Sequence, residues 1–198
     1  MGKTNLGLVQ YCKNQLGLPY WWGTFGQIAS QSLYEQKKAQ YPNQYTANDF
    51  KSQFGLRVHD CVGLIKGYLW TIDGVLTYNA SQDKDVSGMK ANCSDSGTIN
   101  TIPEIPGVLV FMSGHVGVYI GDGMVIEAKG HKFGVVQTKL SERPWTHWGK
   151  LKWIDYYESK EETIKKFYGL DDNTIKYLQY YRYGTALIDK LYIKAKNG

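Results

Sequence analysis

The chain has 198 residues, of which 42% are hydrophobic, and it carries a formal net charge of +5. These values fit one domain of ordinary size, with or without a short appendage, and they exclude wholesale disorder. A positive charge of this size suits nucleic acid, an anionic cell wall or no partner at all, so net charge alone selects no function.

Three cysteines, Cys12, Cys61 and Cys93, limit the redox and metal chemistry open to the chain. An odd number argues against a disulfide framework, and without a CxxC pair a structural zinc site is not expected. The N-terminal residues lack an apolar run of signal-peptide length, and no stretch of about 18 apolar residues occurs. We therefore expect no signal peptide and no membrane span, so action outside a cell would need phage delivery or another route of export.

The N-terminal part is predicted to begin with a helix over residues 4–18. Apolar residues recur there at helical spacing, Thr4 or Asn5 can cap the start, and Cys12 lies on the apolar stripe as a core residue. An aromatic extended segment, a second helix and a surface stretch with a short helix near 47–54 are expected to follow, at residues 20–27, 28–40 and 41–58.

A third helix is predicted over residues 59–70, with Cys61 in its first turn. Asp60 is a favourable N-cap residue, and the apolar residues behind the cysteine fall at helical spacing. Residues 73–100 are polar and are expected to form a long excursion that carries a short helix and Cys93.

Short strands are predicted next. Val108–Met112 is an apolar run, and His115–Ile120 and Met124–Ala128 flank the tight turn at 121–123, which predicts a hairpin. Further strands are expected at Val135–Gln137 and Lys152–Ile154.

Helical periodicity returns near the C-terminus, where residues 158–168 and 172–192 predict two helices joined at 169–171. These helices either pack on the preceding domain or present a basic aromatic surface to a wall polymer, a protein or nucleic acid. The residues of that surface would be Tyr177, Tyr180, Tyr181, Tyr183, Lys160, Lys165, Lys166, Lys176, Lys190, Lys194 and Lys196.

Cys61 is the strongest candidate for a chemical role. A thiol at a helix N-terminus meets the positive end of the helix dipole, which favours the nucleophilic thiolate and lowers the pKa from about 8.5. Backbone N–H groups at the same place can stabilise a developing oxyanion. The alternative is a buried structural thiol.

His115 and Glu127 are candidates for the base and for the group that orients it. His115 begins a strand, where its side chain can reach a cleft beside a helix N-terminus. The hairpin turn brings Glu127 of the next strand across from His115, and a carboxylate is otherwise unusual in the apolar run MVIEA. The alternatives are a polar residue at a strand end and an outward-facing glutamate, and His131 is a rival orienter.

Four segments taken together resemble the NlpC superfamily of papain-like cell-wall peptidases. They are an aromatic-glycine segment, an Asp-Cys-x-Gly helix start, a Gly-His-Val-Gly strand with a glycine turn, and a polar residue on the next strand: PYWWG (19–23), HDCVGLI (59–65), PGVLVFMSGHVGVYIGDG (106–123) and VIEA (125–128). The resemblance implies an α+β fold, hydrolysis of peptidoglycan stem peptides, often between D-γ-glutamate and the diamino acid, and no metal or cofactor.

Position by position, Cys61 matches the nucleophile, His115 the base and Glu127 the third polar position, where the family more usually has His, Asn or Gln. Tyr20 matches a groove tyrosine, and Asp60 matches an acidic residue that holds the substrate's amine or caps the helix. Val62 stands where Ser is common, which argues against a preference for stems with a free N-terminal L-Ala. The implied organisation is a peptidase domain at 1–155, long insertions at 27–57 and 73–100, the first as an extra lid, and a helical appendage of unknown role at 156–198.

Other aromatic residues are expected near the groove or in the core. Trp21, Trp22 and Phe25 either stack on substrate or belong to the core, and His59 is expected at the surface. The remaining ones are expected to close the sheet edge by packing, namely Trp145, His147, Trp148 and Trp153.

Related and unrelated functions remain alternatives. An N-acetylmuramoyl-L-alanine amidase or a cross-bridge endopeptidase would keep the roles of Cys61 and His115. A transferase would pass the same acyl group to an amine. A noncatalytic wall-binding or virion structural module would retain only the fold.

Overall fold

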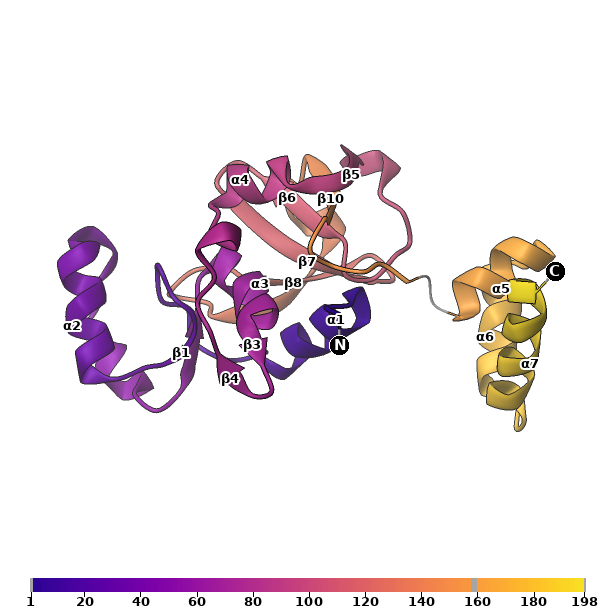
Figure 1. The fold of residues 1–198 in the computed structure, drawn as a ribbon, viewed down its shortest axis with the longest axis horizontal. Coiled ribbons are helices and arrows are strands. Elements are labelled where there is room, and N and C mark those ends of the chain that lie inside the picture. Colours follow the sequence, from indigo (N-terminus) through magenta and orange to yellow (C-terminus); the bar gives the residue numbers. More distant parts are fainter. Residues whose placement is uncertain (1, 158–159, 198) are drawn as a thin grey trace. The chain divides into compact units, whose positions relative to one another are not determined.

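The computed structural model describes residues 2–157 and 160–197, and the chain divides into two compact units, Met1–Tyr156 and Tyr157–Gly198 (Figure 1). Each unit has a hydrophobic core of its own.

The α-helices of the first unit each begin at a polar cap. The side chains of Thr4, Ser30, Asp60 and Asp85 accept a hydrogen bond from a backbone N–H in the first turn. Such caps stabilise a helix by about 1 kcal/mol each. The capped helices are α1 (Asn5–Asn14), α2 (Gln31–Gln40), α3 (Cys61–Trp70) and α4 (Val86–Ala91).

The centre of the first unit is an antiparallel sheet, six-stranded among the described residues, in the order β5-β10-β6-β7-β8-β9. Two small ribbons, β1-β2 and β3-β4, lie outside it. The strands are β1 (Phe25–Ile28), β2 (Arg57–His59), β3 (Thr71–Ile72), β4 (Val75–Leu76), β5 (Cys93–Thr98), β6 (Leu109–Met112), β7 (His115–Gly121), β8 (Met124–Ala128), β9 (Val135–Lys139) and β10 (His147–Leu151).

Both faces of the central sheet are buried. Leu109 and Phe111 of β6 belong to the larger core, which includes α1 and α3, whereas Val108 and Val110 belong to a second core with Trp145. Alternate side chains of a strand point to opposite faces, so β6 is apolar throughout. The helix that carries the cysteine therefore packs on one face of the sheet, beside β7 and β8 (Figure 1).

The predicted α+β architecture is confirmed, with the cysteine helix on an antiparallel sheet. The hairpin of β7 and β8 turns where the glycines predicted it. The prediction of a strand at Lys152–Ile154 is wrong, because the chain turns there. The strand of this region is β10, which ends at Leu151. Residues 93–98, expected within an irregular excursion, form the edge strand β5, which pairs by its backbone although its side chains are polar.

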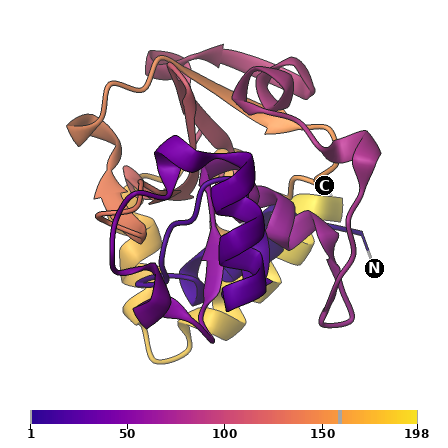
Figure 2. The same ribbon diagram turned by 90° about the vertical axis from the view of Figure 1, so that its left-hand side faces the viewer.

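Residues 29–58 build a small aromatic core around Trp21. Trp21 has no exposed surface and contacts the rings of Tyr45 and Phe50 edge to face. Figure 2 shows this segment, including α2, coming forward in the side view. Trp21 therefore belongs to the core, which is one of the two roles expected for it from the sequence.

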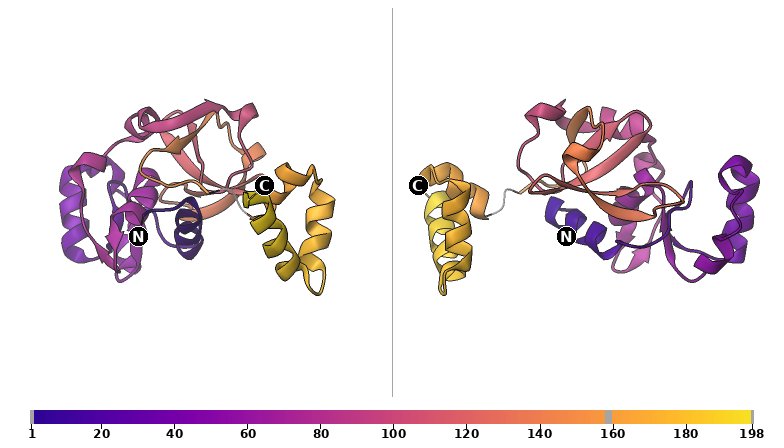
Figure 3. Two further views of the ribbon diagram at one scale, coloured as in Figure 1. Left: turned by 45° about the vertical axis from the view of Figure 1, so that its right-hand side comes forward. Right: turned by 180° about the vertical axis from the view of Figure 1, so that it is seen from behind.

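The second unit consists of α5 (Lys160–Tyr168), α6 (Asp172–Tyr180) and α7 (Gly184–Asn197), whose buried residues are Ile164, Ile175 and Ile188 (Figure 3). The prediction of a single helix over residues 172–192 is wrong, because α6 and α7 are separate helices. A Cβ atom at Gly184 would lie 1.7 Å from the Leu178 carbonyl oxygen, so the chain turns tightly between α6 and α7. Position 158, where the first helix was expected to begin, lies outside the described residues.

No helix within residues 2–157 or 160–197 is long and apolar enough to cross a membrane.

Candidate active site

Cys61 is the first residue of α3, and its thiol is almost completely buried. The Asp60 carboxylate caps the helix, since its Oδ1 accepts a hydrogen bond from the Gly63 N–H at 2.6 Å. A Cβ atom at Gly63 would lie 1.8 Å from the Thr24 carbonyl oxygen, so glycine lets the helix start approach that segment closely. The backbone N–H groups of Val116 and Val62 interact with the sulfur, and such groups can stabilise an oxyanion.

The protonation of Cys61 differs from the sequence-based expectation. Burial, followed by the negative charge of Asp60, raises the pKa of the thiol to about 12, although backbone N–H groups act in the opposite direction. The expected lowering by the helix N-terminus is therefore wrong, because loss of hydration outweighs the local dipoles. The resting thiol keeps its proton at neutral pH, and a nearby base must remove it.

The His115 ring is held by Glu127. Its Nε2 lies 2.7 Å from the Glu127 Oε2 atom, and the carboxylate has no exposed surface. Two further side chains donate to the same carboxylate, Thr138 to Oε1 at 2.8 Å and Arg143 to Oε2 at 3.0 Å. With Nε2 engaged, Nδ1 is the ring nitrogen that can receive a proton from a thiol.

Glu127 is buried yet remains ionised. Burial alone would raise its pKa, but hydrogen bonds from His115 and Thr138 and the positive charge of Arg143 together lower the pKa below its ordinary value. A buried carboxylate is tolerated only with such partners.

His115 and Glu127 meet diagonally rather than directly across the hairpin. Val118 pairs with Ile126, so the same register places Gly117, and not His115, opposite Glu127. The expectation that Glu127 lies directly across from His115 is corrected accordingly. Gly117 has no side chain, and a Cβ atom there would lie 3.0 Å from the Trp145 ring. The gap lets the histidine reach the carboxylate.

Arg143 and Trp145 are the parts of the site that sequence reasoning missed. The Trp145 ring stacks on the His115 ring, with centroids 5.8 Å apart and an interplanar angle of 19°. The Arg143 guanidinium lies 5.9 Å from the Trp145 centroid. Trp145 was expected to pack at a sheet edge; it is buried, but over the face that carries His115. His147 and Trp148 lie in β10, an interior strand.

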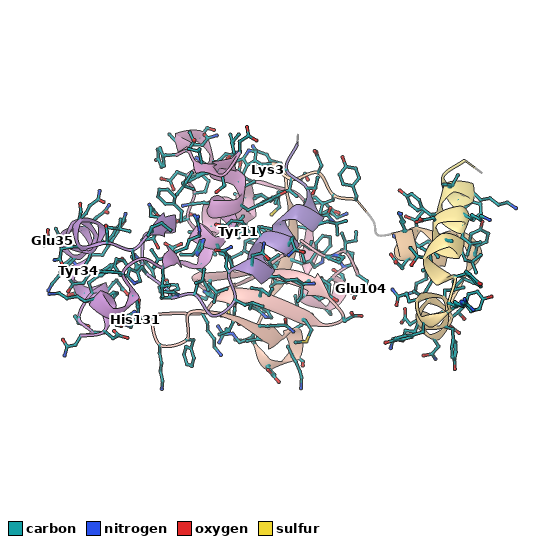
Figure 4. All side chains as sticks on the ribbon, turned by 90° about the horizontal axis from the view of Figure 1, so that it is seen from below. Lys3, Tyr11, Tyr34, Glu35, Glu104 and His131 are labelled. Atoms are coloured by element: carbon teal, nitrogen blue, oxygen red, sulfur yellow. The ribbon has the colours of Figure 1, made fainter. Side chains whose placement is uncertain are left out.

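His131 does not take part in this arrangement. Its Nε2 lies 2.6 Å from Asp49 Oδ1, and its ring is 4.3 Å from that of Phe50. Figure 4 shows it toward the end of the unit that holds Tyr34, whereas Tyr11 lies nearer the middle. The alternative that His131, rather than Glu127, orients His115 is therefore wrong.

Two adjoining cavities surround the thiol. Cys61, Tyr20, Trp22 and Gly114 line both, the smaller of about 280 Å³ including His115. The larger, of about 570 Å³, includes Asp60 and Phe25. Trp22 is 41% exposed, so its ring remains accessible at this groove.

Asp60 and His59 are more deeply engaged than expected. Asp60 Oδ2 accepts a hydrogen bond from the Gly23 N–H at 2.9 Å, so both carboxylate oxygens bind backbone, and burial raises its pKa. His59 was expected at the surface, which is wrong. It is fully buried, and its Nε2 lies 2.8 Å from the Tyr11 hydroxyl. Burial and the charge of Arg57 lower its pKa to about 3.

Among the residues that the structure describes, no group of three or more His, Cys, Asp or Glu side chains is placed to hold a metal ion.

The sequence matches the model of the NlpC/P60 family over residues 17–152. No curated protein sequence matches the chain. Among solved structures, NlpC1 from Trichomonas vaginalis is 16% identical, with 78% of this chain and 46% of that chain covered and a TM-score of 0.45.

Two mycobacterial structures also resemble the chain. The P60 domain of a Mycobacterium avium subspecies paratuberculosis antigen is 21% identical, with coverages of 77% and 96% and a TM-score of 0.47. The peptidoglycan hydrolase RipB from Mycobacterium tuberculosis is 18% identical, with coverages of 77% and 65% and a TM-score of 0.47. The chain spans about half the length of the Trichomonas proteins NlpC1 and NlpC2, 46% and 49%.

A cysteine-bearing helix packed on an antiparallel sheet is the papain-like arrangement, and the fold of the chain is of that class. The family match identifies it further: the chain belongs to the NlpC/P60 family, whose members act on peptidoglycan.

The lowered pKa of Glu127 predicts a specific acid sensitivity. Because the folded-state pKa lies below the ordinary 4.5, Glu127 contributes stability above pH about 4.5, and this is lost as pH falls through the folded-state pKa. Urea unfolding between pH 2.5 and 7, on the order of half-unit steps, should show a steeper acid loss for wild type than for Glu127→Gln.

The matched control is Glu142→Gln, since Glu142 is exposed. Its unfolding free energy should follow the wild-type pH dependence. Identical pH profiles for wild type and Glu127→Gln would contradict the assignment of a stabilised, ionised Glu127.

Proposed function

We propose that Cys61 is the nucleophile, His115 the general base and acid, and Glu127 the group that orients the imidazole, in an enzyme that hydrolyses peptide bonds of peptidoglycan stems. The observation that carries the proposal is the Glu127-held imidazole of His115 beside the cavity that it shares with Cys61. The activity would be exerted at the bacterial cell wall.

The first half of the reaction forms an acyl-enzyme. The Cys61 proton moves to Nδ1 of His115 as the sulfur attacks the carbonyl carbon, and the resulting oxyanion is stabilised by the N–H groups of Val116 and Val62. His115 then protonates the leaving amine, the C–N bond breaks, and a thioester remains on Cys61.

The second half releases the acid. His115 removes a proton from a water molecule, whose oxygen attacks the thioester carbon, and the C–S bond breaks. The proton returns to the sulfur, so the thiol is restored, which suits a Cys61 whose pKa is raised. Each cycle consumes one water and one amide bond and yields one acid and one amine.

Arg143 and Trp145 serve as positioning residues in this proposal. Arg143 balances the charge of Glu127, which keeps the carboxylate an acceptor for the His115 Nε2–H. Trp145 covers one face of the imidazole and restricts its rotation.

The bond that we favour joins D-γ-glutamate to the diamino acid. The larger cavity has the volume of a site for a short peptide, and aromatic rings of Tyr20 and Trp22 line it next to Cys61. Asp60 would affect the substrate indirectly, because it caps the start of the helix that carries Cys61. An amidase or a cross-bridge endopeptidase would use the same three catalytic groups on a different bond.

The domain organisation is also part of the proposal. Residues 1–155 would form the catalytic domain, with 27–57 and 73–100 as insertions around the groove, and 156–198 a helical appendage. The appendage presents exposed tyrosines, among them Tyr177 and Tyr180, which suit contact with a wall polymer or a virion component. Delivery by a phage would make the chain an endolysin.

Mass spectrometry of soluble products from purified peptidoglycan tests the function. Wild type should release stem fragments whose masses identify the bond, and Cys61→Ala should release none, because it lacks the thiol that would form the thioester. Circular dichroism should show that both proteins are folded. Equal release by Cys61→Ala would contradict the mechanism, and no release by folded wild type from several wall types would favour a wall-binding or structural module.

Substitutions at the base and its orienting group should differ in their effect. His115→Ala should lower kcat/KM by about 10²- to 10⁴-fold, since it removes general acid–base catalysis. Glu127→Gln should lower it less, because the amide oxygen can still accept the His115 Nε2–H. Steady-state rates on a soluble stem peptide measure both, and exposed Glu142→Gln should match wild type.

A Glu127→Gln loss as deep as that of His115→Ala would contradict a purely orienting role and assign the charge itself to catalysis.

A further inference from the structure

Six charged side chains line the larger cavity beside Cys61, namely Lys37, Asp60, Lys66, Asp83, Lys84 and Asp85. The Lys66 ammonium lies 2.6 Å from Asp83 Oδ1, which neutralises this part of the wall. Both oxygens of Asp60 are occupied by backbone N–H groups. These charges are therefore committed to the protein itself.

Lys37 is the more deeply buried of the two lysines of this cavity, Lys37 and Lys84, that have no ion pair among the described residues. It comes from α2, within the segment 27–57, lines the same cavity as Cys61, and is only 8% exposed. Among the described residues, no carboxylate lies within ion-pair distance of its Nζ, which makes one long hydrogen bond of 3.3 Å to Gln40 Oε1. The Nζ atom also lies 5.8 Å from the centroid of the Tyr41 ring, and because an ammonium has three N–H donors, it can still donate to a ligand in the cavity.

An unpaired ammonium in a buried position is costly to the fold. Burial lowers the pKa of Lys37, the more distant carboxylates of Asp60 and Asp83 oppose this, and Lys66 lowers it further. A lysine kept at such a site without a carboxylate partner is well suited to receive that partner from a ligand.

We propose that Lys37 is a specificity-determining residue that binds a carboxylate of the stem peptide. The inference rests on the proposed function and extends it to the kind of stem that is cleaved. A glutamate linked through its γ-carboxyl keeps its α-carboxylate free, on the same residue that supplies the scissile carbonyl. The diamino acid is a second source of a free carboxylate, because diaminopimelate carries an additional carboxylate that lysine lacks.

Two matched pairs of stem peptides distinguish these sources. One pair differs only in α-carboxylate against α-carboxamide on the γ-linked D-glutamate. The other pair differs only in diaminopimelate against lysine as the diamino acid. Amidation removes the charge at nearly constant shape, so a preference within the first pair reports recognition of the charge.

The variant is Lys37→Met, which keeps most of the side-chain volume and removes the ammonium. Wild type should prefer the carboxylate member of one pair by about tenfold to hundredfold in kcat/KM, the range for a hydrogen bond to a charged group. Lys37→Met should lose that preference and cleave the neutral member at the wild-type rate.

The control is Lys38→Met on the same helix. Lys38 is exposed and its Nζ lies over the Tyr34 ring, so this variant should keep the wild-type preference. If the unfolding midpoint shows that Lys37→Met does not fold, Lys37→Gln replaces it.

If wild type, Lys37→Met and Lys38→Met all cleave the peptides and Lys37→Met keeps the wild-type preference, the inference is overturned and the proposed function remains intact. Failure of wild type to cleave any peptide would instead count against the proposed function. In that case, calorimetric binding of the same peptides to Cys61→Ala and to the Cys61→Ala, Lys37→Met double variant decides. Weaker binding of the carboxylate member alone supports the inference, and equal binding overturns it.

Discussion

The buried carboxylate of Glu127 is the constraint on which the rest of the site depends. It lies in an apolar strand with no exposed surface, so it must find donors inside the protein. His115, Thr138 and Arg143 supply them from three different parts of the chain. Removing one partner of a buried ion pair typically costs about 3–5 kcal/mol, so the same contacts that orient the imidazole also fix how β7, β8 and β9 are held together. Orientation of the His115 ring, the proposed base, is thus a consequence of folding.

Local sequence signals predicted the elements that hold the candidate site, because each is specified by nearby residues. Asp60 capping the cysteine helix and the glycine turn before β8 are examples, and the pairing of His115 with Glu127 followed from the hairpin. Arg143 could not be predicted, since its contact with Glu127 spans 16 residues and the chain between them passes through β9 and a short 3-10 helix, Leu140–Glu142. The raised pKa of Cys61 could not be predicted either. It depends on how much water the folded core excludes, which no local motif encodes.

The groove owes its shape to residues outside the four motif segments as well as to those within them. Trp21 anchors an aromatic core that holds α2 against the rest of the first unit, and α2 in turn supplies Lys37 to the wall of the larger cavity. A segment expected to be an insertion therefore supplies part of the wall of the cavity next to Cys61. The polar stretch at 73–100 contributes in the same way, since Asp83 pairs with Lys66 beside that cavity.

The most direct test of the account is the tautomer of His115, read from long-range ¹H–¹⁵N NMR correlations of the resting protein at a pH where the ring is neutral. With Glu127 accepting a hydrogen bond from Nε2, the account predicts a proton on Nε2 and a bare Nδ1 available to the Cys61 thiol. In Glu127→Leu, which cannot accept this bond, the preference for that tautomer should disappear. A proton on Nδ1 in the wild-type protein would contradict the account, because the nitrogen assigned to the thiol could then not receive its proton.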